Sequence, residues 1–312
     1  MEVVGPDECT PPVRGTAVTI GAYDGIHLGH RALLAELRRR ADELGVSTAV
    51  VTFDRHPATV VRPDSAPLLL TDLDQKLELL GACGIDRTVV VPFDAARADE
   101  TAEDFVTEVL VGDLGARLVV VGEDFHFGHG RKGNVEVLRD LGAQHGFSVT
   151  GVRLTGAAGD AVSSTRIRHL VAAGDVEEAR VLLGRPLQLR GVVVRGDGRG
   201  GSALGFPTAN VALSPGLALP GEGIYAGRYE RPDGTVHPAA ISTGRRPTFY
   251  RDAPPLLEAH LIDFSGDLYD ERARVSFVAR LREDRKFDSV DALVAQMGRD
   301  VDRARELLAA DR

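Results

Sequence analysis

The first half of the chain alternates between two hydrophobic patterns. Short runs of aliphatic and β-branched residues, such as residues 47–53, are followed by stretches in which leucines recur at helical spacing, as Leu33, Leu34 and Leu37 do. These patterns predict strands at 16–21, 47–53, 87–93, 117–122 and 147–154, and helices at 30–44, 72–81, 102–110, 134–144, 164–173 and 176–183. Strands and helices that alternate in this way predict crossover connections and a parallel sheet, which binds ligands beyond the carboxyl ends of its strands.

The pattern changes after residue 186, where short apolar runs are separated by Gly, Pro and Asp. Strands are predicted at 189–195, 223–230, 238–243, 256–263 and 274–281, residues 204–211 favour a loop and a strand, and residues 290–310 have clear helical spacing. This succession of short strands is typical of an antiparallel barrel or sandwich. We therefore predict two domains, residues 1–186 and residues 187–312.

Composition narrows the class of protein. The chain has 312 residues, of which 43% are hydrophobic and 27% charged, enough for two soluble cores. The formal net charge of −9 argues against a nucleic-acid binder, which needs a basic face, and two cysteines cannot form a cysteine-based zinc site. No apolar run has the length of a membrane span. We expect a cytoplasmic monomer or weak homo-oligomer that acts on small molecules, with no nucleic-acid or membrane partner.

The first candidate site follows the predicted strand at 16–21. The segment Gly21–His30, GAYDGIHLGH, combines glycines with the start of a helix, whose free N–H groups suit a phosphate. His27 and His30 are separated by Leu-Gly, so both can face that phosphate and donate hydrogen bonds to a phosphorane-like transition state. The alternative is a glycine-rich turn with two incidental surface histidines. The H-x-G-H spacing directly after a strand favours the catalytic interpretation.

A second segment, Ser163–Arg168, suits the same task. Its sequence SSTRIR opens a predicted helix with hydroxyls and two cations. Ser163 or Ser164 could be a helix N-cap, which is a common structural role. The two roles are compatible, because hydroxyls, helix N–H groups and arginine together can hold a polyphosphate.

The second half has a glycine-rich segment, residues 191–205, that continues into Gly205-Phe206-Pro207-Thr208-Ala209-Asn210. A dinucleotide fingerprint is disfavoured because no helix follows, and the lysine-containing P-loop motif is absent from the sequence. We interpret the segment as a glycine flap over phosphates, with Thr208 and Asn210 offering oxygen ligands to Mg²⁺. A simple turn before a strand is the alternative.

Further along the chain, a carboxylate stands on a predicted strand. Alternation places Glu258 and His260 on one face, and Leu257, Ala259 and Leu261 on the other. Glu258 could accept the proton of an attacking hydroxyl. Taken alone, it would more often be a solvated strand residue.

Four segments resemble, in order and spacing, the adenylyltransferase module of bacterial bifunctional riboflavin kinase/FAD synthetases. They are GAYDGIHLGH at 21–30, TFDRHP at 52–57, GEDFHFG at 122–128 and SSTRIR at 163–168. The resemblance implies an α/β Rossmann-like nucleotidyltransferase domain in which His27 and His30 are catalytic. It also implies that ATP contacts Gly21, Asp24, Gly29, Asp124, Ser164, Thr165 and Arg168, and that the flavin contacts Phe53, His56 and Phe125.

The second half resembles the riboflavin kinase module of the same family, through residues 196–210, 223–227, 241–249, 257–269 and 285–287. This resemblance implies a Greek-key six-stranded β-barrel with a C-terminal helix and Glu258 as the base for the riboflavin hydroxyl. It implies Mg²⁺ at Thr208 and Asn210. The ATP-binding residues would be Gly196, Gly200, Gly205, Pro207, Thr208 and Asn210.

The sequence therefore predicts an enzyme that phosphorylates riboflavin to FMN and adenylylates FMN to FAD, using ATP and Mg²⁺. Two alternatives stay open: an enzyme with only one active module, most readily the adenylyltransferase, or a flavin-binding protein without turnover. Three arginines depart from the family pattern. Arg55 replaces a proline, and Arg245 and Arg246 replace Thr-Asn, so flavin preference and kinase activity are the least determined features.

Overall fold

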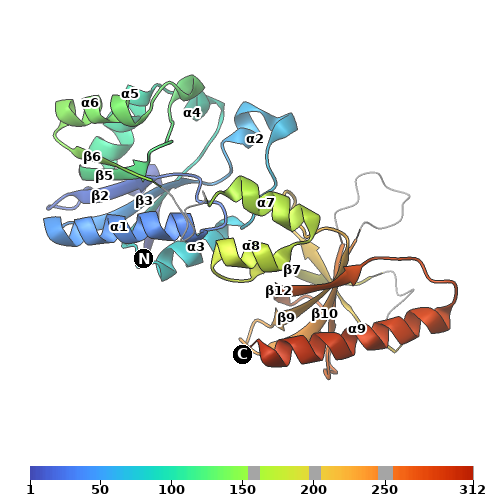
Figure 1. The fold of residues 1–312 in the computed structure, drawn as a ribbon. Helices are drawn as coiled ribbons and strands as arrows, with labels where there is room; N and C mark the ends of the chain where they lie inside the picture. Colours follow the sequence, from blue (N-terminus) through green and yellow to red (C-terminus); the bar gives the residue numbers. More distant parts are fainter. Residues whose placement is uncertain (154–161, 197–204, 245–255, 312) are drawn as a thin grey trace. The chain divides into compact units, whose positions relative to one another are not determined.

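A computed structural model describes residues 1–153, 162–196, 205–244 and 256–311. The chain forms two compact units, which Figure 1 shows as ribbons. The first comprises residues 1–69 and 73–163, and the second comprises residues 70–72 and 164–312. We describe each unit by itself.

The first unit is built on a six-stranded parallel sheet. Its strands are β1 (Glu2–Val4), β2 (Thr16–Ile20), β3 (Ser47–Phe53), β4 (Arg87–Val91), β5 (Ala116–Gly122) and β6 (Ser148–Val152). Their order is β1-β4-β3-β2-β5-β6, and every pair is parallel. The predicted parallel sheet is thereby confirmed. Strand β1 was not predicted, because a strand of three residues is too short to show a periodicity.

Helices cover both faces of this sheet (Figure 1). The helices of this unit are α1 (Leu28–Leu44), α2 (Ala58–Val61), α3 (Leu73–Ala82), α4 (Ala95–Asp99), α5 (Ala102–Phe105) and α6 (Val135–His145). Alternate strand residues point to opposite sides, so Val18 packs in one core with Phe105 and Leu138, while Ala17 packs in the other with Leu34. The helix predicted at 102–110 begins as α5 and continues as a π-helix over Val106–Asp113.

The second unit contains a closed six-stranded antiparallel barrel. Its strands are β7 (Leu187–Val194), β8 (Ala209–Leu213), β9 (Gly223–Glu230), β10 (Val236–Gly244), β11 (Leu256–Leu261) and β12 (Arg272–Glu283). Their order around the barrel is β10-β11-β8-β7-β12-β9, so β8 and β9 are consecutive in sequence but not adjacent, as in a Greek key. Tyr225, Tyr229 and Phe277 are fully buried. The predicted barrel is confirmed.

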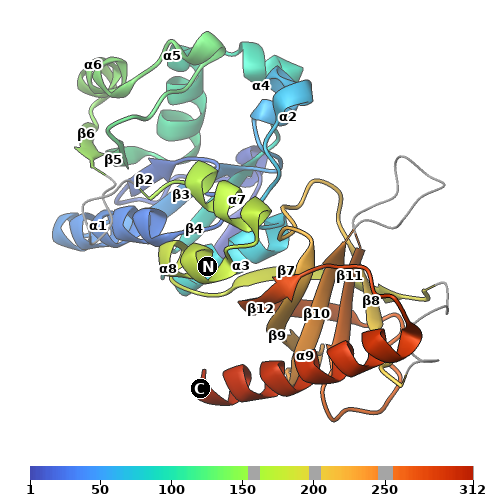
Figure 2. The same cartoon turned by 45° about the vertical axis from the view of Figure 1, so that its right-hand side comes forward.

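Helix α9 (Val290–Ala310) lies along the barrel strands β9 and β10 (Figure 2). Its apolar face, which includes Ala304 and Leu308, packs against Val278. The buried Asp300 forms a bidentate ion pair with Arg282, whose Nη2 lies 2.8 Å from Asp300 Oδ2. This pair was not predicted, because a periodicity of apolar residues does not reveal a buried charge.

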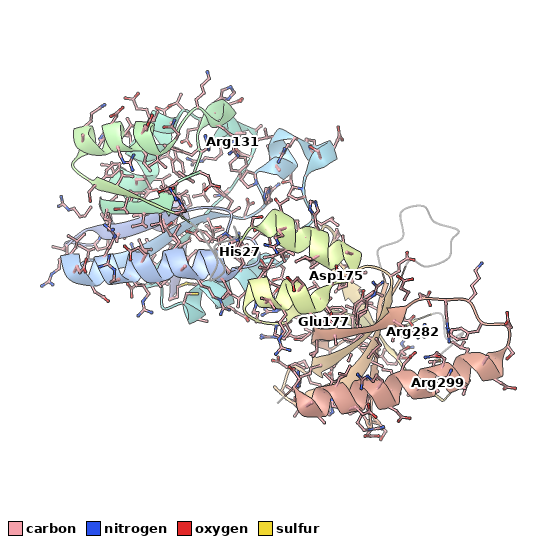
Figure 3. The ribbon with its side chains drawn as sticks, in the orientation of Figure 1. His27, Arg131, Asp175, Glu177, Arg282 and Arg299 are labelled. Carbon is pink, nitrogen blue, oxygen red and sulfur yellow. The ribbon has the colours of Figure 1, made fainter. Side chains whose placement is uncertain are left out.

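The second unit also includes α7 (Ser164–Ala173) and α8 (Val176–Leu183). Arg280 of β12 joins both to the barrel, since its Nη1 donates to Ala173 O at 3.1 Å and its backbone N–H donates to Glu177 Oε1 at 2.9 Å. Figure 3 labels Glu177 near the start of α8. The compact unit therefore begins before residue 187. The functional boundary at 186/187 stays a prediction, because packing and catalysis need not divide at the same residue.

The helices of the described part of the chain include none that is long and apolar enough to cross a membrane.

The close packing of β9 against its paired strands β10 and β12 requires a glycine at position 227. A Cβ there would collide with the carbonyl oxygen of Ser276 and with Ile241 Cδ1. We expect Gly227→Ala to lower the free energy of unfolding by about 2–4 kcal/mol, since a backbone carbonyl cannot yield easily. Urea denaturation followed by circular dichroism measures the change.

Gly298→Ala is the matched control. A Cβ at Gly298, inside α9, meets nothing within 4 Å, and alanine favours the helix by about 1 kcal/mol. This variant should be as stable as the wild type or more stable. Equal destabilisation by both substitutions would contradict the packing argument.

Candidate active sites

The order of the parallel sheet locates the first candidate site. After β4 the chain crosses to β5 on the other side of β2, so the carboxyl ends of β2 and β5 flank the point where the strand order reverses. In open α/β sheets this point forms the ligand crevice. The loops at these ends lie within two of the predicted segments, 21–30 and 122–128: residues 21–27 follow β2 and residues 123–128 follow β5.

The loop after β2 has a constrained backbone. Tyr23 and Ile26 adopt left-handed conformations, with φ of 50° and 39°, which are uncommon for residues with large side chains. Buried anchors hold them there: the Tyr23 hydroxyl lies 2.6 Å from Thr19 Oγ1, and Ile26 is fully buried. Such residues concentrate at functional sites, where the surrounding structure offsets their strain. The constrained backbone of this loop therefore fixes the position of His27.

His27 and His30 are brought together as predicted. His27 is the N-cap of α1, as Figure 3 shows, and its ring stacks on that of His30 with centroids 3.6 Å apart. The His30 backbone N–H donates to His27 Nδ1 at 3.3 Å, so a neutral His27 carries its proton on Nε2. Burial, and then the neighbouring His27, lower the pKa of His30 well below 6.5. The His30 ring is therefore neutral at physiological pH.

Gly29 allows another segment to approach the two histidines. A Cβ at Gly29 would lie 3.2 Å from the His27 ring and 3.4 Å from Val162 O. Val162 is buried and comes two residues before α7. Ser164, Thr165 and Arg168 lie in the first turns of α7, which belongs to the second unit. Their part in the first site stays a prediction.

The segment after β3 contains the predicted flavin contacts. Phe53 packs edge-on against Phe93 with ring centroids 5.1 Å apart, and His56 Nδ1 accepts a hydrogen bond from Ala58 N–H at 3.1 Å. Arg55 is paired with its neighbour Asp54, with Arg55 Nη2 at 2.9 Å from Asp54 Oδ2. The charge that departs from the family pattern is thus compensated within this segment.

The segment after β5 presents Asp124 and Phe125. Asp124 is exposed, and its carbonyl oxygen lies 2.8 Å from His126 Nδ1. Phe125 is half-buried and stacks on the buried Phe127, with ring planes 14° apart. The buried Phe127 ring restricts the movement of the Phe125 ring, so Phe125 presents a fixed apolar face beyond the carboxyl end of β5.

The second candidate site lies on a row of residues across the barrel. In the strand register, Asn210 of β8 is directly opposite Glu258 of β11, which is in turn opposite Ser242 of β10. Directly opposite side chains lie on one face with Cβ atoms about 5 Å apart. Their neighbours Leu257 and Ala259 are fully buried, whereas Glu258 is half-buried. The predicted alternation is confirmed.

The segment before β8 is held against this row. His260 Nδ1 lies 2.8 Å from Pro207 O, and its ring packs edge-on against Phe206. Thr208 is half-buried and immediately precedes β8. A Cβ at Gly196 would lie 2.9 Å from Asn210 Cγ, so the start of the glycine segment touches the amide. Sequence reasoning did not assign Ser242 or His260 to the site, because the register of paired strands is not visible in one sequence.

The chemistry of this row suits a hard cation. It offers hydroxyl, amide and carboxylate oxygens, the donors that Mg²⁺ takes together with substrate phosphates. No group of three or more His, Cys, Asp or Glu side chains that could hold a metal occurs among the residues that the structure describes. Gly205 precedes the row with a φ of 83°. Gly200, Arg245 and Arg246 lie outside the described residues.

Comparisons with known proteins match both halves. Residues 10–166 match the family described as FAD synthetase, and residues 183–308 match the family described as riboflavin kinase. The chain is similar to the bifunctional riboflavin kinase/FMN adenylyltransferase of Pseudomonas fluorescens, with 40% identity covering 96% of this chain and 95% of that one. Proteins with the same description from Escherichia coli K12 (38% identity; 95% and 93% covered) and Bacillus subtilis (34%; 91% and 90%) are also similar.

A solved structure is similar over almost the whole chain. It is the crystal structure of a protein described as a macrolide-efflux protein from Streptococcus pneumoniae, with a TM-score of 0.85 and 30% identity. The similarity covers 98% of this chain and 99% of that one.

The half-buried His30 makes the stability of the fold depend on pH. Its pKa is lowered in the folded state, so below pH 6.5 the unfolded chain takes up a proton that the folded chain does not. Stability therefore falls as the pH drops through 6.5. At about pH 5.5 the resulting loss of stability amounts to roughly 1 kcal/mol.

His30→Gln, which cannot titrate, should lose that much less stability than the wild type between about pH 7.5 and 5.5. Urea denaturation at the two pH values measures the difference. The same pH dependence in both proteins would show that His30 is protonated in the folded state.

Proposed function

The chain belongs to the family of bifunctional riboflavin kinases/FMN adenylyltransferases, and from that premise we propose how its residues divide the two reactions. The enzyme phosphorylates riboflavin to FMN with ATP, and it adenylylates FMN to FAD with release of pyrophosphate. We assign the second reaction to residues 1–186 and the first to residues 187–312. The stacked histidine pair at the start of α1 and the Asn210–Glu258 register pair carry this assignment.

Adenylyl transfer requires alignment more than acid–base chemistry. The FMN phosphate is already anionic at neutral pH, and its oxygen attacks the α-phosphorus of ATP while the bond to pyrophosphate breaks. Charge develops on the oxygens around that phosphorus. His27 would donate a hydrogen bond to these oxygens from Nε2–H. His30, whose ring stacks on the ring of His27, would hold that ring in place and donate a second hydrogen bond to the same oxygens. No carboxylate base is needed.

We assign the remaining residues of the first site from their positions in the fold. Phe53, His56 and Phe125 would contact the flavin, since aromatic faces at the strand ends suit an isoalloxazine ring. The backbone around Gly21 and Gly29, with Asp24 and Asp124, would surround the nucleotide. Ser164, Thr165 and Arg168 would hold its β- and γ-phosphates.

The kinase reaction needs a base, because the riboflavin 5′-hydroxyl is neutral. Glu258 would accept that proton as the hydroxyl oxygen attacks the γ-phosphorus of ATP and ADP leaves. Thr208 and Asn210 would hold Mg²⁺, which neutralises phosphate charge when bound. The glycine segment from Gly196 through Gly200 to Gly205, with Pro207, would cover the phosphates.

The alternatives of one active module or of a non-catalytic flavin-binding protein are not favoured. The relatives named for both activities match this chain over nearly its whole length. A cytoplasmic location, a monomeric or weakly oligomeric state and the absence of nucleic-acid partners stay predictions.

Glu258→Gln tests the kinase assignment. An amide cannot accept the hydroxyl proton, so FMN formation from riboflavin should fall by roughly 100-fold or more. Conversion of supplied FMN to FAD should stay within about twofold of the wild type. Chromatography of the flavin products measures both rates.

Glu306→Gln is the matched control, because this exposed carboxylate lies on α9 and pairs with Arg303. It should leave both activities unchanged. Loss of both activities in Glu258→Gln would show that the base is misassigned or that the units depend on each other.

His27→Ala should produce the converse result. Removing a donor to the developing charge costs roughly 100- to 1,000-fold in rate, so FMN should accumulate from riboflavin. His145→Ala, at the exposed end of α6, is the control and should form FAD normally. Unchanged FAD formation by His27→Ala would remove the histidine pair from the mechanism.

A further inference from the structure

Lys76 is a buried cation to which the two reactions give no role. It lies on α3 and only 7% of it is exposed. Lysine is rare in this chain: among 37 Lys and Arg residues, the lysines are Lys76, Lys132 and Lys286. Burying an ammonium group is costly, so its presence requires compensating contacts.

The Lys76 ammonium has three such contacts. Nζ donates to Phe53 O at 2.8 Å, to Thr52 Oγ1 at 3.1 Å and to Ala22 O at 3.3 Å. These acceptors match its three N–H groups, so Lys76 has none left for a substrate. Thr52 Oγ1 also donates to Ala22 O at 3.4 Å, which closes the cluster.

These contacts lie where the hydrogen-bonded ladder between β2 and β3 ends. Strands β2 and β3 pair as far as Ile20 and Val51, and Gly21 N–H donates to Val51 O at 3.0 Å as the last rung. Beyond it Ala22 lies outside the register between β2 and β3 and leads to His27, whereas Phe53 is still paired with Val91 of β4 and leads to His56. Lys76 therefore links the phosphate-binding loop to the flavin-contacting segment by a side chain.

We propose that Lys76 is a positioning residue for adenylyl transfer, which fixes the carbonyls of Ala22 and Phe53 and so sets the distance between the histidine pair and the flavin segment. This inference rests on the proposed function of the first site. The reaction joins an FMN oxygen to the α-phosphorus, and misalignment of two bound substrates lowers rate more than binding.

The protonation of Lys76 should make the rate of FAD formation depend on pH, which a purely structural role in packing would not do. Burial lowers its pKa to about 8, while Asp24 and Asp54 act in the opposite direction. Above that pH a neutral amine has two N–H groups for three acceptors. The unfolded chain keeps its proton up to about pH 10.5, so this group makes the fold more stable as pH rises from 8. Rate and stability should thus change in opposite directions.

The test compares full-length Lys76→Met, Lys76→Arg and the control Lys132→Met, an exposed lysine of the same unit. The substrates are FMN and ATP, and riboflavin phosphorylation in the same preparations reports on the second unit. We expect Lys76→Met to lower kcat for FAD formation roughly ten- to 100-fold, with dissociation constants for FMN and ATP within about threefold of the wild type. Lys76→Arg should not restore the rate, because a planar guanidinium does not fit three converging acceptors.

The pH profile separates positioning from folding. In the wild type kcat should decline above about pH 8, and in Lys76→Met it should be flat between about pH 7 and 9. A kcat within threefold of the wild type, a decline that persists in Lys76→Met, or an equal loss of substrate binding would each overturn the proposal. Failure of the proposed function differs, since the wild type itself would then not convert FMN to FAD.

Discussion

The hydrogen-bonded ladder between β2 and β3 ends at Gly21 and Val51, and the residues to which we assign the chemistry of the first unit follow a few positions beyond it. A polyphosphate must meet backbone and side-chain donors that do not move, yet the segment after β2 has just lost its ladder partner on β3. The structure supplies other restraints: the Tyr23–Thr19 hydrogen bond, the buried Ile26 and the Lys76 ammonium. The stacked histidines depend on all three, because they follow this loop directly.

The two units meet a similar demand by different means. In the parallel sheet, loops at strand ends would surround the nucleotide, and the neutral His30 suits a reaction whose nucleophile is already charged. In the barrel, the strand register itself aligns Asn210, Glu258 and Ser242 across neighbouring strands. We assign a base, Glu258, to the barrel because the riboflavin hydroxyl must lose a proton. Each proposed set of residues thus suits the charge of its nucleophile.

Much of this architecture could be predicted from the sequence, because periodicity and turn residues determine long elements. Residues 47–53, 164–173, 223–230 and 290–310 form the predicted elements with the predicted ends. The pairing of His27 with His30 and the placing of Glu258 on the strand face opposite Leu257 and Ala259 followed from spacing alone. Strand β1, the Arg282–Asp300 pair and Lys76 did not, since short strands and buried charges are defined by partners distant in sequence. The strands that pair with β11 on either side of Glu258 likewise could not be predicted from the sequence and are known only from the folded structure.

The most direct test of the account follows the flavins over time after the purified protein is mixed with riboflavin, ATP and Mg²⁺. If each unit carries one reaction, FMN should rise first and then decline as FAD and pyrophosphate appear. A parallel mixture that starts from FMN should form FAD without a lag. Riboflavin that stays unchanged while supplied FMN is converted, or FMN that accumulates without FAD, would contradict the claim that both units are active.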